Sequence, residues 1–167
     1  TRTLYERQAL RTDTVGSKEE LTVSARQSTK ARPSMSRERV LRTAMDLADR
    51  DGLESLTMRR LAKELGVEVM TLYYYVAKKD DILDGMADLV AMEIELPTGG
   101  AGWKAAARQR AISAHDVLVR HPWASLLWVS REAHGPGRLR YMDAGLRGFR
   151  EAGFSPELTE QAFHAVE

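Results

Sequence analysis

Residues 56–82 read LTMRRLAKELGVEVMTLYYYVAKKDDI, and this stretch has the spacing of a helix-turn-helix. Ala62 is small enough to let two helices approach closely, and Gly66, four residues later, can take the positive φ of a tight turn. Leu72, six residues further on, would hold the second helix against the first. Such a connection fixes the second helix outward, where its N-terminal half fits a DNA major groove about 12 Å wide.

The second helix of this unit is predicted over residues 69–76 and would expose several side chains once Leu72 and Val76 are buried. Successive helical residues lie about 100° apart, so three consecutive tyrosines cannot all enter the core. The side chains expected to face outward are Val69, Met70, Thr71, Tyr73 and Tyr74. The basic neighbours suited to phosphate contacts, which position a protein without reading sequence, are Arg59, Arg60, Lys78 and Lys79. Alternatively, the tyrosines pack on a neighbouring helix and the lysines are only solvated.

Elsewhere after residue 35 the apolar spacing is helical, and no segment shows a sustained period of two. We expect helices to begin after the capping residues Ser36, Thr57 and Asp80, and to end at Gly52 and Gly66. Further helices are predicted over residues 103–120, near Pro122, over 138–152 and from Ser155 onward, with loops at 97–102 and 133–137. The chain is therefore predicted to be all-α, with an N-terminal three-helix helix-turn-helix domain before a second helical domain.

Three regions follow from these patterns. Residues 1–35 form a polar arm with seven basic and four acidic side chains, either a functional arm or a solvated tail. Residues 36–82 form the helix-turn-helix domain. Residues 83–167 form a helical domain for ligand binding and dimerisation.

Composition excludes several classes of function for this chain of 167 residues and net charge +1. Cysteine is absent, which removes disulfides, thiolate zinc sites and a cysteine nucleophile. The longest apolar runs are about six residues, far short of a membrane span. His115, Asp116 and His121 lack the further ligands of a metal site, and Ser113 and His115 face different ways on a helix. We therefore predict no enzyme activity, no metal, no cofactor and no membrane partner.

Residues 37–86, RERVLRTAMDLADRDGLESLTMRRLAKELGVEVMTLYYYVAKKDDILDGM, resemble the DNA-binding domain of TetR-family transcriptional regulators along their whole length. GWKAAARQRAISAHDVLVRHPW and GFREAGFSPELTEQAFHAVE resemble effector-domain helices in the branch nearest the tetracycline repressor. The resemblance implies a cytoplasmic bacterial repressor that binds a palindromic double-stranded operator as a homodimer and is released by a small-molecule effector. The alternative is a helical dimerising or adaptor domain without sequence-specific DNA binding of its own.

The resemblance also assigns residues to both sites. The positions where the family contacts its operator are Arg59, Val69, Met70, Thr71, Tyr73, Tyr74, Tyr75 and, at phosphate, Lys79. Val69 and Met70 depart from the polar and small residues of many relatives, so the operator sequence cannot be transferred.

In the effector domain, Arg110, Ala114 and Trp128 replace the asparagine, phenylalanine and metal-ligand histidine of the tetracycline repressor. We therefore expect an apolar pocket with one buried cation, for an anionic or aromatic metabolite, and not tetracycline with its metal. The pocket candidates are Met92, Arg110, Ala114, Trp128, Met142 and Leu146. The alternative is that these tryptophan and methionine side chains are simply core residues.

The last predicted helix carries Leu158, Ala162 and Val166 four residues apart, which makes one apolar stripe. In the relatives the last long helices form the dimer interface. Because the chain stops at Glu167 after about three turns, we expect the intact protein to continue and to dimerise through this helix and a later one. The 167 residues alone are expected to dimerise weakly.

Overall fold

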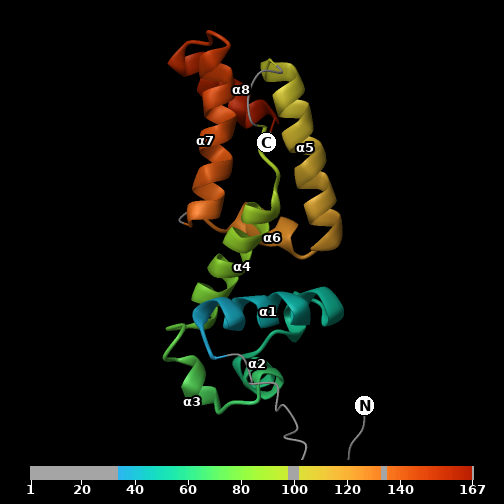
Figure 1. Ribbon diagram of the computed structural model, residues 1–167, viewed down its shortest axis with the longest axis vertical. Coiled ribbons are helices and arrows are strands. Elements are labelled where there is room, and N and C mark those ends of the chain that lie inside the picture. Colours follow the sequence, from blue (N-terminus) through green and yellow to red (C-terminus); the bar gives the residue numbers. More distant parts are fainter. Residues whose placement is uncertain (1–33, 98–101, 133–134, 167) are drawn as a thin grey trace, which may run out of the picture. The chain divides into compact units, whose positions relative to one another are not determined.

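The computed structural model describes residues 34–97, 102–132 and 135–166, and its regular structure in these ranges is entirely helical (Figure 1). The elements are α1 (Arg37–Asp51), the 3-10 helix η1 (Leu53–Ser55), α2 (Met58–Leu65), α3 (Val69–Leu72), α4 (Lys79–Glu93), α5 (Trp103–Arg120), α6 (Ala124–Ser130), α7 (Pro136–Glu151) and α8 (Pro156–Val166). The predicted all-α class is confirmed. The arm predicted over residues 1–35 lies almost wholly outside the described residues, as do parts of both predicted loops.

Three helix starts and one helix end follow from local capping, as the sequence predicts. The Ser36 hydroxyl accepts the Arg39 amide at 3.1 Å, and the Thr57 hydroxyl accepts the Arg60 amide at 3.2 Å. Gly66 ends α2 in the left-handed region with φ of 69°. The Ser155 hydroxyl accepts the Leu158 amide at 3.2 Å, which caps α8. No helix within the described ranges is both long and apolar enough to cross a membrane.

Two helix starts differ from the prediction. Asp80 does not cap α4; the Asp81 carboxylate accepts the amides of Ala77 and Lys78 at 2.9 and 3.2 Å. A carboxylate at the third helical position reaches back to these amides, so the helix begins earlier. Helix α7 begins at Pro136, two residues before its predicted start, because proline suits the first helical position.

Helix α4 packs against α1 and also against α5, α6 and α7. In Figure 1 it runs from the α1–α3 group to the α5–α8 group. Its side chains Ile82, Met86 and Val90 are at most 1% exposed. They belong to one continuous apolar cluster that extends from Val40 in α1 to Tyr141 in α7. A displacement of α4 would therefore change the packing of α1 and of α7, because both helices contribute to this core.

Arginine side chains add polar contacts along α4. Arg131, which follows α6, binds the Asp80 carboxylate at 2.7 Å and also binds Asp84. Arg140 of α7 donates to the Met92 and Ile94 carbonyls at 3.1 and 2.9 Å, at the C-terminal end of α4. A cation at this end suits the helix dipole, so both ends of α4 are held by arginines.

Helix α1 is joined to the turn between α5 and α6. The Asp49 carboxylate oxygen lies 2.8 Å from His121 Nδ1 and accepts the Trp123 indole N–H at 2.6 Å. The other ring nitrogen of His121 faces Glu93 of α4 at 3.3 Å. One half-buried histidine thus contacts acidic side chains from two helices.

At Gly85, helix α4 lies close against Leu41 of α1, and this contact gives a test of the packing. A methyl group at Gly85 would lie 2.7 Å from both terminal methyls of Leu41, whereas one at Gly148 in α7 would meet nothing within 4 Å. We predict that Gly85→Ala lowers the free energy of unfolding by about 1–3 kcal/mol through overpacking. Gly148→Ala should raise it by up to about 1 kcal/mol, because alanine favours helices. Urea unfolding measures both, and equal effects of the two substitutions would contradict the close approach.

Candidate functional site

The turn between α2 and α3 has the geometry that the sequence spacing predicts. Ala62 is 1% exposed, and its carbonyl accepts the Val67 amide at 3.0 Å, which closes the turn after Gly66. Leu72 and Val76 are 0% and 3% exposed, so they anchor the segment after the turn in the core. A rigid helix-turn-helix unit is the result.

Helix α3 is shorter than predicted. It ends at Leu72, and the three tyrosines continue as turns in which the Tyr73 and Tyr74 amides bond to carbonyls three residues back, both at 3.3 Å. Aromatic residues are only moderate helix formers, and bonds of this type tighten the end of a helix. The tightened segment still buries Val76, and it leaves Tyr73 and Tyr74 exposed and Tyr75 half-buried.

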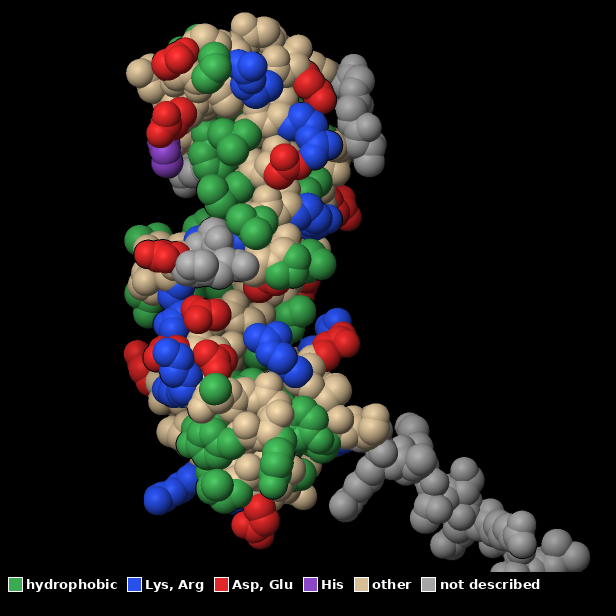
Figure 2. Space-filling model, turned by 90° about the vertical axis from the view of Figure 1, so that its left-hand side faces the viewer, with side chains coloured by type: hydrophobic (Ala, Val, Ile, Leu, Met, Phe, Trp, Pro, Cys, Tyr) green, Lys and Arg blue, Asp and Glu red, His purple; other side chains and the backbone are tan. Residues whose placement is uncertain are grey.

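The exposed face of this segment is apolar and aromatic. Met70 is 71% exposed, Tyr73 45% and Tyr74 87%. Figure 2 shows hydrophobic side chains gathered at the lower end, where Figure 1 places α2 and α3. Val69 and Tyr75 are half-buried against the core, so the prediction that Val69 faces freely outward is wrong. Thr71 is also half-buried.

The basic side chains of the predicted phosphate-binding set are of two kinds, those that are exposed and those that form ion pairs within the protein. Arg59, Lys78 and Lys79 are exposed beside α3. Arg60 instead binds Asp51, and Arg50 bridges Asp51 and Glu64 at 3.0 and 3.3 Å. Hydrogen bonds to Asp51 and Glu64 raise the pKa of Arg50. These ion pairs join α1 to α2. Arg60 is therefore assigned to holding these two helices together and not to a phosphate contact.

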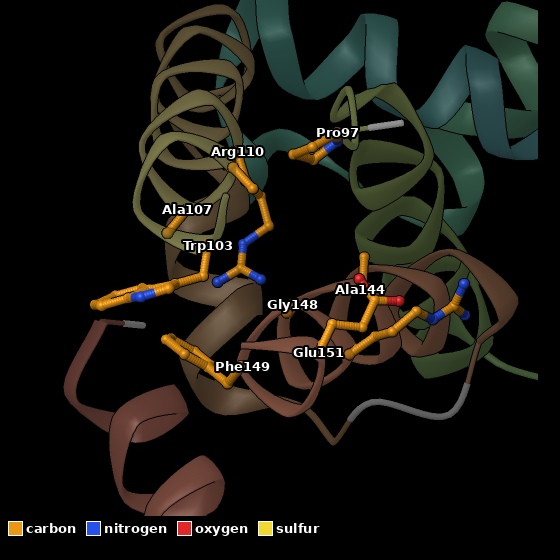
Figure 3. Close-up of a pocket in the computed structure, with 11 residues that line it drawn as sticks. Pro97, Trp103, Ala107, Arg110, Ala144, Gly148, Phe149 and Glu151 are labelled. Carbon is orange, nitrogen blue, oxygen red and sulfur yellow. The ribbon is translucent and has the colours of Figure 1, made fainter. Parts of the chain in front are cut away.

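A cavity of about 360 Å³ lies between α5 and α7. Trp103, Ala106, Ala107 and Arg110 line it from α5, and Gly145 and Phe149 line it from α7. Figure 3 shows the Arg110 side chain reaching from α5 toward α7, with Trp103 and Phe149 on one side and Glu151 on the other. Arg110 is 5% exposed, so the expected buried cation is present.

Arg110 is the one member of the predicted pocket set that lines this cavity. Trp128 instead packs edge-on against Tyr141, with ring centroids 5.2 Å apart, and beneath the Arg138 guanidinium. Met92 is 49% exposed, and Ala114 packs against the main core. Met142 and Leu146 are half-buried on α7 outside the cavity lining. Sequence reasoning missed Trp103, Gly145 and Phe149, because their juxtaposition depends on how α5 and α7 pair.

Two family models together match most of the chain. Residues 40–86 match the model described as "Bacterial regulatory proteins, tetR family", and residues 96–167 match "Tetracyclin repressor-like, C-terminal domain". The first match contains the helix-turn-helix, and the second contains the cavity between α5 and α7. The chain belongs to the TetR family of bacterial transcriptional regulators.

Curated relatives and solved structures agree with this assignment. The chain is 39% identical to the HTH-type transcriptional repressor DrrR1 of Streptomyces coeruleorubidus, over 76% of this chain and 48% of that one. It is 32% identical to the class D tetracycline repressor of Escherichia coli, over 72% and 56% of the two chains. Apo ActR of Streptomyces coelicolor superposes with a TM-score of 0.75 at 28% identity, over 79% and 64%. The chain spans about half the length of the curated relatives it matches.

The exposure pattern around α3 predicts which substitutions affect DNA alone. Tyr74 is almost fully exposed, so Tyr74→Ala should leave the melting temperature unchanged while weakening binding to the best DNA site by about 1–3 kcal/mol. Tyr73→Ala should act in the same direction. Val129→Ala, at an 89% exposed position on α6, is the control and should change neither quantity. Parallel losses of thermal stability and DNA affinity would assign the tyrosines to the core.

Proposed function

We propose that this chain is a ligand-responsive transcriptional repressor that binds a palindromic operator as a homodimer and is released by a small-molecule effector. The observation that carries the proposal is the rigid α2–turn–α3 unit, which presents Met70, Tyr73 and Tyr74 beside exposed basic side chains. Two structural relatives support it. ActR was solved with actinorhodin, at 28% identity, and BioQ was solved with its double-stranded DNA operator, at 26% identity and a TM-score of 0.69 over 80% of each chain.

The proposed roles follow from exposure and charge. Met70, Tyr73 and Tyr74 contact base edges and thymine methyl groups in the major groove. Arg59 and Lys79 contact phosphates and set the register. Half-buried residues of the same surface contact the operator with the part of each side chain that remains exposed: Val69, Thr71 and Tyr75.

Release by a ligand requires the cavity to influence the helix-turn-helix unit. Arg131 connects the end of α6 to Asp80, which is the neighbour of Lys79 in the first turn of α4. Asp49 of α1 is bound by His121 and Trp123, beside the end of α5. A ligand that favours one arrangement of α5 and α7 would shift α4 and α1 through these contacts and change the position of α3.

Homodimerisation fits the geometry of operator reading and the surface of α8. One recognition helix covers only a few base pairs, so helix-turn-helix proteins bind two half-sites as dimers. Thr159 and Phe163 of α8 are buried, whereas Leu158 and Val166 on another face are 48% and 52% exposed. This exposed apolar face is the proposed contribution of α8 to the dimer interface.

The second candidate function is a helical adaptor without sequence-specific DNA binding, and salt dependence separates the two. Binding of a repressor to duplex DNA should weaken steeply with salt, because phosphate contacts release counterions. Lys79→Ala should weaken binding to every sequence alike and reduce the slope of log affinity against log salt by about one. Arg108→Ala removes an exposed charge on α5 and is the control. An unchanged slope for Lys79→Ala, or no binding at low salt, would favour the adaptor.

Dimerisation gives a separate prediction. Leu158→Glu places a charge on the exposed face of α8 and should shift the chain toward monomer in sedimentation velocity. The affinity for a DNA site with two-fold symmetry should fall as well, because a monomer contacts only one half-site. Leu126→Glu, at a 63% exposed position on α6, should leave the sedimentation coefficient unchanged. Equal behaviour of the two variants would place the interface away from α8.

A further inference from the structure

One wall of the cavity between α5 and α7 is aromatic. Trp103, at the start of α5, and Phe149 of α7 line it, and their ring centroids lie 5.6 Å apart with the planes tilted by 50°. Phe154, in the turn before α8, packs against both rings, with centroid distances of 5.3 Å to Trp103 and 5.4 Å to Phe149. Each ring is packed against the other two, so this wall is fixed in position.

The walls where the two helices face each other are made of very small residues. These are Ala106, Ala107, Ala144, Gly145 and Gly148. In Figure 3, Gly148 lies in the middle of the lining residues. A methyl group at Gly148 would meet nothing within 4 Å, so the space beside α7 is open at this residue. Two helix backbones with hardly any side-chain bulk between them form a slot that suits a flat molecule.

The charged side chains of the cavity wall either have partners within the protein or reach solvent. The Arg110 guanidinium carbon lies 5.0 Å from the centroid of the Tyr141 ring and 5.8 Å from that of Phe163, so this buried arginine is already engaged. Arg147 and Glu151 are exposed, so water solvates them. An ionised ligand would lose its hydration beside charges that are engaged or solvated, so the wall favours an uncharged ligand.

The volume of the cavity limits the size of the ligand. About 360 Å³ lies in the lower part of the range of small-molecule sites, which suits two or three fused rings. Aromatic rings attract one another in offset or edge-on contacts, and Trp103 and Phe149 offer such contacts to a flat ring. A saturated ring system of the same connectivity is thicker and has no π face, so it fits this slot less well.

We propose that this cavity binds an uncharged, planar aromatic molecule of two or three fused rings, held against Trp103 and Phe149 and between the small residues of α5 and α7. The inference rests on the proposed function and deepens it, because it assigns a chemical class to the effector. Gly148 determines the specificity, since the absence of its side chain leaves open the space that the ring system fills.

Calorimetric titration with matched probes tests the ligand class. The aromatic probes are 2-naphthol and 2-hydroxyfluorene, which are uncharged at neutral pH, and their counterparts are the fully hydrogenated alcohols. At least one aromatic probe should bind the chain about tenfold more tightly than its saturated counterpart, which lacks the contacts with two aromatic side chains. 2-Naphthoate, a charged molecule with the same rings, should bind more weakly than 2-naphthol.

Three results of this titration would overturn the proposal. They are saturated counterparts that bind as tightly as the aromatic probes, no binding of either aromatic probe, and 2-naphthoate that binds as tightly as 2-naphthol or more tightly.

A pair of tryptophan variants tests the aromatic wall. Trp103→Leu keeps the wall apolar but removes its ring, so most of the preference for the aromatic probe should be lost. Trp128→Leu makes the same change outside the cavity lining, where Trp128 packs on Tyr141, and should retain the preference. The same preference in both variants would contradict contact between the ligand and Trp103.

Gly148→Leu tests the location of the ligand without removing a contact. The leucine side chain extends into open space, so the melting temperature should not fall, while the affinity for the aromatic probe should fall tenfold or more, by an order-of-magnitude estimate. Ala111→Leu adds the same side chain at an exposed position of α5 outside the lining and should bind the probe as the parent chain does. An unchanged affinity in Gly148→Leu would place the ligand elsewhere and overturn the proposal.

Operator binding without any probe reports the proposed function separately. If the parent chain binds DNA specifically but does not discriminate between the paired probes, the ligand class is wrong and the repressor function stands. If it discriminates between the probes but binds no DNA sequence specifically, the ligand site stands and the repressor function fails. Where both hold, saturation with the tighter aromatic probe should lower operator affinity, and an unchanged operator affinity would overturn the assignment of this ligand class to the effector.

Discussion

Helix α4 packs both against α1 of the DNA-binding region and against α5, α6 and α7, and both proposed sites depend on this double packing. Its first turn follows the recognition segment directly, with Asp81 capping the helix and Asp80 bound by Arg131. Its middle is buried in the core that α1 shares, and Gly85 allows the contact with Leu41. The carbonyls of Met92 and Ile94, at its C-terminal end, accept hydrogen bonds from the Arg140 guanidinium. In the proposed mechanism, a change near α7 would reach α3 as a displacement of α4, because close-packed cores shift between discrete arrangements.

The two sites use opposite chemistry. The surface around α3 has exposed lysines that suit a polyanion and aromatic side chains that suit base edges. The cavity wall holds the buried Arg110 between two aromatic rings and against a glycine. An exposed charge is screened by salt, whereas a buried charge is screened much less. DNA binding should therefore depend strongly on salt, and ligand binding should depend on it weakly.

Local chemistry made much of the fold predictable from the sequence. Ser36, Thr57, Gly66 and Ser155 act through bonds to residues within a few positions, so their roles are visible without tertiary structure. The spacing of Ala62, Gly66 and Leu72 likewise predicted the helix-turn-helix. Asp80 was mistaken for a cap because Asp81 competes with it locally, and only the distant Arg131 shows what Asp80 binds.

The cavity was less predictable, since its walls come from helices far apart in sequence. Arg110 was identified as the buried cation, but its partners Tyr141, Gly145 and Phe163 were not. The short α3 was missed for a different reason. Three tyrosines fit a helical pattern in the sequence, yet the amides of Tyr73 and Tyr74 bond to carbonyls three residues back, and α3 ends at Leu72.

Selection of bound sequences from a random duplex DNA pool is the most direct test of the central claim, which is sequence-specific operator recognition by the α2–α3 unit. An inverted repeat whose half-sites are related by two-fold symmetry should be enriched, as expected for paired recognition helices. The same selection with Tyr74→Ala should lose the enrichment at particular base positions while retaining salt-dependent binding. Failure of the parent chain to enrich any sequence, at a salt concentration where it binds random DNA, would contradict sequence-specific recognition by the α2–α3 unit.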